Sequence, residues 1–315
     1  MGSHILDSLR QHKLDTAVLL RGTSDRRFLE PHLGRMEVRL GSITDRDSLL
    51  TATKGITHVV HCAGLTKALK VSELYEINHL GTRNLVDALN AQTTPAQRLL
   101  HISSLAAAGP ATPENPARED APPRPVSEYG KSKLAGELEV RERCRAPFTI
   151  IRPPAVYGPR DTGFLSMFKA VRSHLLPRPA KAQALSLAYA KDLAEAVVAC
   201  LVHPGTAGKT YFVASPEIVT SRSISEEIAA QMNRRTIPFP TPTPVLWAVC
   251  LLQQIVSKVT RRASLLNLQK YEELRASGWV CNPSKLLSDI GFACDTRLKQ
   301  GIAETLAWYT REHWL

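Results

Sequence analysis

The sequence predicts an α/β fold in which a doubly wound parallel sheet is accompanied by a small C-terminal lobe. Its 315 residues are enough to bury a large hydrophobic core. Short apolar runs typical of buried strands recur through the first half of the chain, with helix-like stretches between them. Beyond Gly158 the pattern is less regular, which favours a lobe inserted among the last elements of the sheet. We therefore predict a core over residues 1–160, and further sheet elements with a mainly helical lobe over residues 161–315.

Composition narrows the class of protein. The formal net charge is +11 and the isoelectric point is about 9.5, but the basic residues are scattered rather than gathered in one run. An enzyme that handles anionic small molecules accounts for this excess as well as nucleic-acid binding does, so we expect no nucleic-acid partner. The N-terminus lacks the basic and apolar regions of a signal peptide. We expect a cytoplasmic protein with a small-molecule substrate.

The six cysteines show neither a Cys-x-x-Cys pair nor a histidine at metal-binding spacing. Cysteines in this pattern are typically reduced and mostly buried, so we expect neither disulfides nor a metal site. They are Cys62, Cys144, Cys200, Cys250, Cys281 and Cys294.

The first expected strands are short. Residues 16–20 form an apolar run that ends at Arg21, and residues 37–40 alternate like a strand before a turn that contains Ser42. At the end of the second strand of a dinucleotide-binding βαβ unit, an acid selects NAD and an arginine accommodates the 2′-phosphate of NADP. If residues 16–20 are this second strand, Arg21 stands at the deciding position and favours NADP, with NAD as the alternative. The stretch could also be only a solvated basic loop.

The next strand leads into a turn of small residues. Residues 57–62 contain His61, which we expect to pack in the core rather than to catalyse. Ala63 and Gly64 follow, and only small side chains let a backbone approach a cofactor closely at such a place. In the helix after this turn, Asn78 occupies an unfavourable mid-helix position, so it requires a packing or hydrogen-bonding reason.

A tyrosine and a lysine stand four residues apart near the start of a helix that we expect to end at about Arg143. Tyr129 and Lys133 therefore share one face of that helix. A phenol with an ordinary pKa near 10 needs a nearby cation to act at neutral pH, and Lys133 can supply one. The pair alone could also be a surface tyrosine with a solvated lysine. A strand-like run that ends in Ser103 and Ser104 upstream strengthens the catalytic interpretation.

Three segments carry a resemblance to a known family. They are SSLAAAGP at residues 103–110, SEYGKSKLAGE at residues 127–137 and IRPPAVYGP at residues 151–159. In this order and spacing they resemble the extended short-chain dehydrogenase/reductase family, which includes nucleotide-sugar epimerases and dehydratases, 3β-hydroxysteroid dehydrogenases and dihydroflavonol reductases. The resemblance implies a Rossmann-type core that binds a dinucleotide, and it covers nearly the whole chain.

The same resemblance implies roles for individual residues. Tyr129 would be the general acid and base, Lys133 would lower its pKa and hold the nicotinamide ribose, and Ser104 would hydrogen-bond the reacting oxygen. Ser103 is the less favoured of the two hydroxyls for that role. The remaining residues expected to bind or brace the cofactor are Gly2, Arg21, Ser42, Ala63, Gly64, Asn78, Ser103, Pro153 and Pro154. Ser42 stands where the family usually has an aspartate that contacts the adenine.

The N-terminal segment departs from the family pattern. Gly2 resembles the last glycine of a Gly-x-x-Gly-x-x-Gly turn, and the apolar residues at 5, 6 and 9 have helical spacing. The strand and the two glycines that come before it in the family are absent. We favour a truncated or mis-started frame over a cloning remnant. We therefore expect a core without its first strand, weak stability, weak dinucleotide binding and a poor enzyme.

The C-terminal half offers fewer signals. Residues 184–189 and 210–214 are expected strands, and residues 190–197 an expected helix capped near Asp192. Residues 244–256 are nearly all apolar but too few to span a bilayer, which takes about 20. We favour a core or lobe helix here. The alternative is an interfacial helix whose basic end, with Lys258, Arg261 and Arg262, meets lipid phosphates.

These observations predict an NADP-dependent oxidoreductase or epimerase/dehydratase that acts on a nucleotide sugar. The first alternative is the same chemistry on an apolar alcohol, as in steroid dehydrogenases or dihydroflavonol reductases. The second is a non-catalytic protein that senses dinucleotides, which would not need Ser104, Tyr129 and Lys133 together. The family resemblance also allows a homodimer.

Overall fold

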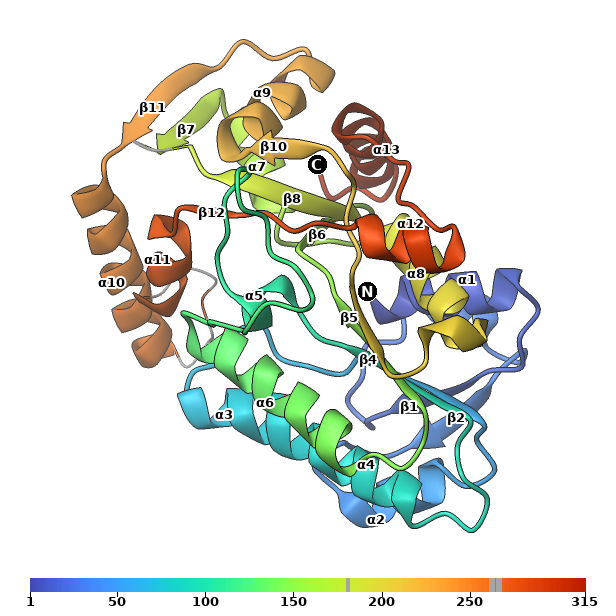
Figure 1. Ribbon diagram of the computed structural model, residues 1–315. Helices are drawn as coiled ribbons and strands as arrows, with labels where there is room; N and C mark the ends of the chain where they lie inside the picture. Colours follow the sequence, from blue (N-terminus) through green and yellow to red (C-terminus); the bar gives the residue numbers. More distant parts are fainter. Residues whose placement is uncertain (180–181, 261–263, 265–267) are drawn as a thin grey trace.

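Parallel strands form the centre of the molecule. The computed structural model describes residues 1–179, 182–260, 264 and 268–315. Four strands pair in the order β3 (His58–His61), β4 (Arg98–Ile102), β5 (Phe148–Arg152) and β9 (Lys209–Phe212). All three ladders are parallel (Figure 1). The predicted α/β fold with a parallel sheet is therefore confirmed.

A second parallel pair lies before this sheet in the chain. β1 (Ala17–Leu20) pairs with β2 (Glu37–Leu40). Within the described residues no ladder joins β1 to β3. A doubly wound sheet has one more strand at this position.

Helices cover both faces of the four-stranded sheet. Alternate residues of β4 point to opposite faces: Leu99 packs in the cluster beneath α4 (Gly81–Asn90) and α6 (Glu128–Arg143), while Leu100 and Ile102 pack towards α1 (Gly2–Gln11) and α8 (Ala190–Val202). Because both faces are covered, the whole of β4 is buried. Helices on two faces of a parallel sheet are the doubly wound arrangement that the sequence predicts.

Smaller sheets build the lobe. β8 (Ala184–Tyr189) pairs with β6 (Ala155–Tyr157), β10 (Ile218–Thr220) and β12 (Gly278–Trp279), and β7 (Leu175–Pro179) pairs with β11 (Ile237–Thr241). The lobe helices are α7 (Leu165–Arg172), α9 (Ser221–Gln231), α10 (Thr243–Thr260), α11 (Leu268–Arg275), α12 (Ser284–Ile290) and α13 (Leu298–Arg311). The remaining short helices are η1 (Glu30–His32), α2 (Arg46–Ala52), α3 (Val71–Tyr75), η2 (Glu76–Leu80), α5 (Leu105–Ala108) and η3 (Pro204–Thr206).

One expectation about the lobe is wrong. Asp192 does not cap α8, because the helix begins directly where β8 ends and Tyr189 is its N-terminal flanking residue. Asp192 lies in the first turn and accepts hydrogen bonds from the backbone and hydroxyl of Thr296. Residues 244–256 belong to the lobe helix α10, one of the two forms expected, but most of its apolar side chains are exposed rather than packed in a core. Arg261 and Arg262, expected at its basic end, lie outside the described residues.

Candidate active site

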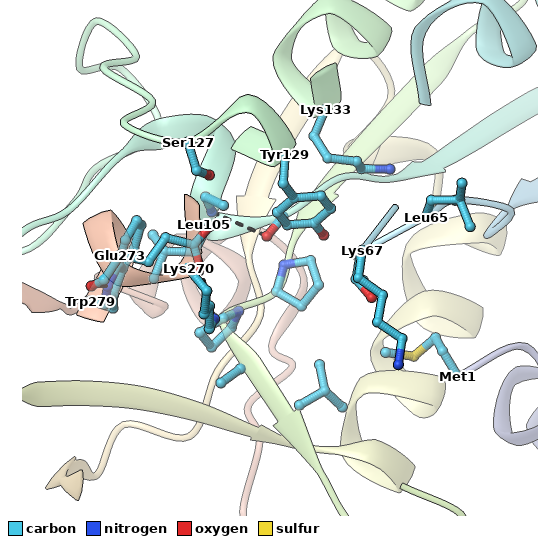
Figure 2. A pocket seen from close by; sticks show the side chains of 18 of the residues that line it. Met1, Leu65, Lys67, Leu105, Ser127, Tyr129, Lys133, Lys270, Glu273 and Trp279 are labelled. Atoms are coloured by element: carbon cyan, nitrogen blue, oxygen red, sulfur yellow. Dashed lines mark hydrogen bonds and ion pairs between the residues drawn. The ribbon is translucent and has the colours of Figure 1, made fainter. Parts of the chain in front are cut away.

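A pocket of about 930 Å³ opens at the carboxyl ends of the parallel strands. Gly64 follows β3, Ser104 follows β4 and Pro153 follows β5, and all three line it. The pocket extends from Met1, at the start of α1, to α10 and α11 of the lobe. Figure 2 shows Tyr129 and Lys133 directed into this space from one helix. Ligands of open α/β sheets bind at this edge.

The first turn of α6 holds Tyr129 in place. Ser127 is the N-cap residue, and its hydroxyl accepts a hydrogen bond from the backbone N–H of Gly130 at 3.1 Å. A Cβ atom at Gly130 would overlap the carbonyl of Ala106, so only glycine lets α6 lie this close to α5. The cap and the glycine together hold the start of α6, with Tyr129, close to α5, the short helix that follows β4.

Lys133 lies one turn farther along α6. Its side chain is 4% exposed, and its ammonium group donates a hydrogen bond to the carbonyl of Ile102 at 2.7 Å. The structure therefore brings the phenol and the ammonium group into one pocket, as their spacing on a helix predicts.

Burial shifts the pKa values of both groups. It raises the pKa of Tyr129 to about 12, against a smaller lowering by the hydrogen bond with Ser104. Burial also lowers the pKa of Lys133 to about 8. The net shift of the Tyr129 pKa is thus opposite to the one expected from the sequence, because the loss of hydration outweighs the hydrogen bond with Ser104. At neutral pH the phenol is a protonated acid.

The two serines after β4 have different partners. Ser104 begins α5, where its hydroxyl accepts the backbone N–H of Ala106 at 3.1 Å, and it also bonds the Tyr129 hydroxyl. Ser103 donates instead to Glu137 of α6, whose carboxylate is also held by Arg152. Ser104 is therefore the hydroxyl that lies beside the Tyr129 phenol, and Ser103 links the end of β4 to α6 through Glu137.

Asn78 supports the pocket from the core side. It is fully buried, accepts the backbone N–H of Leu65, and donates to the carbonyl of Leu65 and the hydroxyl of Ser132. These bonds explain the asparagine at a mid-helix position. A Cβ atom at Gly64 would lie 3.1 Å from the Asn78 side-chain oxygen and 3.6 Å from the Lys133 nitrogen. Gly64 thus leaves free the space beside the Lys133 ammonium group, which a larger side chain would occupy.

The predicted packing of His61 is confirmed. Its side chain is buried and hydrogen-bonds the hydroxyl of Thr82 at 2.9 Å. Cys62 lines the pocket, and burial raises the pKa of its thiol.

The residues present fit a dinucleotide. The first turn of α1 borders the pocket through Met1 and His4, and a Cβ atom at Gly2 would meet nothing within 4 Å. Backbone N–H groups at a helix start suit a pyrophosphate. Hydroxyl and ammonium donors from Ser104 and Lys133 face the other part of the same space. The pocket thus offers hydrogen-bond donors for an anion at one end, and the side chains of Ser104, Tyr129 and Lys133 at the other.

Five residues expected to bind or brace the cofactor are not among those that line the pocket: Gly2, Arg21, Ser42, Ala63 and Asn78. Arg21 is exposed directly after the carboxyl end of β1. Ser42 exchanges a hydrogen bond with Thr44, and Ala63 is exposed before the lining residue Gly64. Pro153 and Pro154 both border the pocket beyond β5, as expected for a turn that leaves the sheet.

Sequence reasoning missed the far wall of the pocket. Gln183, Glu273 and Trp279 come from the lobe and line it opposite the strands. The Gln183 amide donates to the carbonyls of Glu273 and Ala276, and the Trp279 indole donates to that of Glu273. No motif or spacing marks these residues, because they meet only through the pairing of β12 with β8.

The chain is similar in sequence and in fold to known proteins. The model of the family described as "NAD dependent epimerase/dehydratase family" matches residues 1–214. A ceramide reductase of Caulobacter vibrioides is 28% identical over all of this chain and 93% of its own length. A UDP-glucose 4-epimerase of Vibrio cholerae is 27% identical over 76% of each chain. The structure of the Thermus thermophilus UDP-glucose 4-epimerase in complex with NAD superposes with a TM-score of 0.76 at 23% identity, covering 98% of this chain and 95% of that one.

Proposed function

This chain belongs to the NAD-dependent epimerase/dehydratase family, and we propose that it interconverts a secondary alcohol and a ketone with Tyr129 as proton donor and acceptor. The observation that carries the proposal is the meeting of Tyr129, Ser104 and Lys133 in one pocket beside the first turn of α1. A bound nicotinamide supplies or takes up the hydride in such a reaction. A protein that only senses dinucleotides has no need of this arrangement.

The three side chains have separate tasks in this proposal. In the reducing direction the protonated Tyr129 gives its proton to the carbonyl oxygen as negative charge develops there. The Ser104 hydroxyl, already bonded to Tyr129, orients the same oxygen. Lys133 keeps a positive charge next to the phenolate that remains, which opposes the cost of leaving that anion buried.

The cofactor preference is a finer proposal. We infer that NADP binds more tightly than NAD, because the carboxyl end of β1 carries the exposed Arg21 instead of an acid. A guanidinium group pairs with the 2′-phosphate of NADP, whereas an acid would repel that phosphate.

The substrate end of the pocket favours an apolar carbon skeleton. Side chains from several parts of the lobe meet there: Phe164, Met167, Leu185, Leu274 and Trp279. The ceramide reductase of Caulobacter is, by its name, a reductase of a lipid, and this supports a long-chain ketone or alcohol as the substrate class. A nucleotide sugar, the class expected first from the sequence, is the second candidate. It is supported by the Vibrio epimerase and by Arg160 in the lining, although Arg160 already pairs with Asp7.

Tyr129→Phe tests the proposal. The variant should fold and bind NADPH like the wild type but turn over a long-chain ketone about two to four orders of magnitude more slowly, the usual size of general-acid help. The control is Tyr75→Phe, which removes a phenol that donates to Glu128 at 2.9 Å outside the pocket and should leave turnover nearly unchanged. Retention of more than about half of the wild-type rate by Tyr129→Phe would show that another group supplies the proton.

A further inference from the structure

The outer face of the lobe carries an unusual set of exposed apolar side chains. Five residues of α10 recur at alternating spacings of four and three and so form one stripe along the helix: Val245, Val249, Leu252, Val256 and Val259. Ile237 and Phe239 of the neighbouring β11 are also exposed. In Figure 1, β11 and α10 follow one another along the outer edge of the molecule. We call these seven residues the apolar face.

The opposite side of the same helix faces the pocket. Gln254 and Ser257 line it, and Cys250 is buried. Gln254 stands about 200° round the helix from Leu252, since each residue advances by about 100°. α10 is therefore a wall with the pocket on one side and the apolar face on the other.

All charged residues in the sequence around β11 and α10 are basic. From Ile228 to Tyr271 the sequence contains six basic residues and no acidic one. Of these, Arg234 and Arg235 are exposed immediately before β11. An apolar surface bordered by basic residues complements a membrane whose lipids are anionic. It suits a second protein copy less well, because the helix lacks the charges of both signs that usually flank an apolar seam between helices.

No helix in the described part of the chain is long and apolar enough to span a bilayer. The exposed Phe239 of the apolar face fits the boundary between headgroups and acyl chains, where aromatic side chains gather.

We propose that the apolar face docks onto an anionic lipid bilayer and that the pocket behind α10 takes its long-chain alcohol or ketone from that bilayer. The substrate part rests on the proposed function, whereas the docking part does not. With α10 on the membrane, an amphiphilic substrate would not have to pass through water, because the same helix also lines the pocket that contains Tyr129.

Vesicle flotation tests the docking. The full-length protein should float with vesicles of phosphatidylcholine and phosphatidylglycerol, much less with phosphatidylcholine alone, and less at high salt. Leu252→Glu should lower the bound fraction by about tenfold, because it places a carboxylate in the apolar face. Its matched control is Leu287→Glu on α12, which adds the same charge at a leucine of similar exposure, 52% against 61% for Leu252, and should bind like the wild type. Thermal melts of both variants show that they fold.

A double variant tests the contribution of the two exposed arginines before β11. Arg234→Glu combined with Arg235→Glu should weaken binding to the anionic vesicles while leaving the apolar face intact. Equal loss of binding in Leu252→Glu and Leu287→Glu, or no flotation of the wild type, would overturn the docking. So would a wild-type dimer that Leu252→Glu converts to a monomer in analytical ultracentrifugation, because a second copy would then cover the face.

Activity separates the two parts of the proposal. Leu252→Glu should reduce a short, water-soluble ketone at the wild-type rate but act at least several-fold more slowly on a long-chain ketone held in vesicles. If both rates are unchanged in Leu252→Glu, delivery from the membrane is wrong and the proposed function stands. If Tyr129→Phe keeps both rates, the proposed function is wrong, and vesicle binding alone decides the docking.

Discussion

Arg21 is the side chain on which the NADP preference rests. NADPH should bind at least about tenfold more tightly than NADH, a difference of about 1.4 kcal/mol. Arg21→Asp should reduce or reverse this ratio, because the carboxylate repels the 2′-phosphate and accepts from a free 2′-hydroxyl. Isothermal titration calorimetry with NADPH and with NADH measures this affinity ratio.

A charge-matched control is available on the same sheet. Arg35 is exposed immediately before β2, at the opposite end of the strands, so Arg35→Asp should preserve the wild-type ratio. Equal affinities of the wild type for NADPH and NADH would show that Arg21 contacts only solvent.

Lys133 links the site to the stability of the fold. Its pKa falls from 10.5 to about 8 on folding, so the buried charge destabilises the protein fully below pH 8 and ceases to do so as the pH rises towards 10.5. Lys133→Met should therefore gain in unfolding free energy relative to the wild type at pH 7, and this gain should shrink by about 2 to 3 kcal/mol at pH 10.

Urea unfolding of Lys133→Met and the wild type at pH 7 and pH 10 gives the four free energies needed. A difference between the two proteins that does not change with pH would mean that Lys133 is hydrated in solution.

At the scale of the element, the start of α6 couples stability to catalysis. Ser127→Ala removes the cap that accepts the Gly130 N–H and should cost about 1 kcal/mol of unfolding free energy. Because Tyr129 lies in the same turn, turnover should also fall several-fold. Thermal melts and rates at saturating cofactor measure the two effects.

The matched change is Asp45→Ala at the N-cap of α2, a helix that contributes nothing to the pocket lining. It should lower stability by a similar amount and leave turnover nearly unchanged. If Ser127→Ala destabilises the protein without lowering its turnover rate, the cap does not position Tyr129.

At the scale of the whole molecule, one buried ion pair joins the helix layer to the sheet. Glu137 of α6 accepts two hydrogen bonds from Arg152 of β5, at 2.8 and 2.6 Å, and both side chains are buried. Glu137→Leu should cost about 3 to 5 kcal/mol, because it leaves a buried guanidinium group without its counterion. Adding Arg152→Met should restore much of that loss.

Denaturant unfolding of the two single variants and the double variant forms a double-mutant cycle for this pair. Asp25→Asn breaks an ion pair with Arg27 in which both side chains are exposed, and it should change the unfolding midpoint little. If the double variant is no more stable than Glu137→Leu alone, the pair does not act as a unit.

Local sequence patterns were sufficient to predict the parallel strands and the meeting of Tyr129 and Lys133. The apolar runs that end at Ile102 and Arg152 form the parallel strands β4 and β5, which are almost fully buried because both faces of the sheet are covered. The runs that end at Leu20 and Leu40 also form parallel strands, β1 and β2, although β2 is largely exposed. The four-residue spacing of Tyr129 and Lys133 brought both into one pocket, since helix geometry alone places them on one face.

Tertiary structure decided what depends on distant segments. The far wall of the pocket, with Gln183 and Trp279, forms only when β12 pairs with β8, and no local pattern encodes that pairing. The upward shift of the Tyr129 pKa likewise depends on how completely the lobe and the strand ends exclude water from it. The apolar composition of α10 was visible in the sequence, but an apolar helix can pack in a core or face outward. Only the packing of its Gln254 side against the pocket left the apolar face exposed.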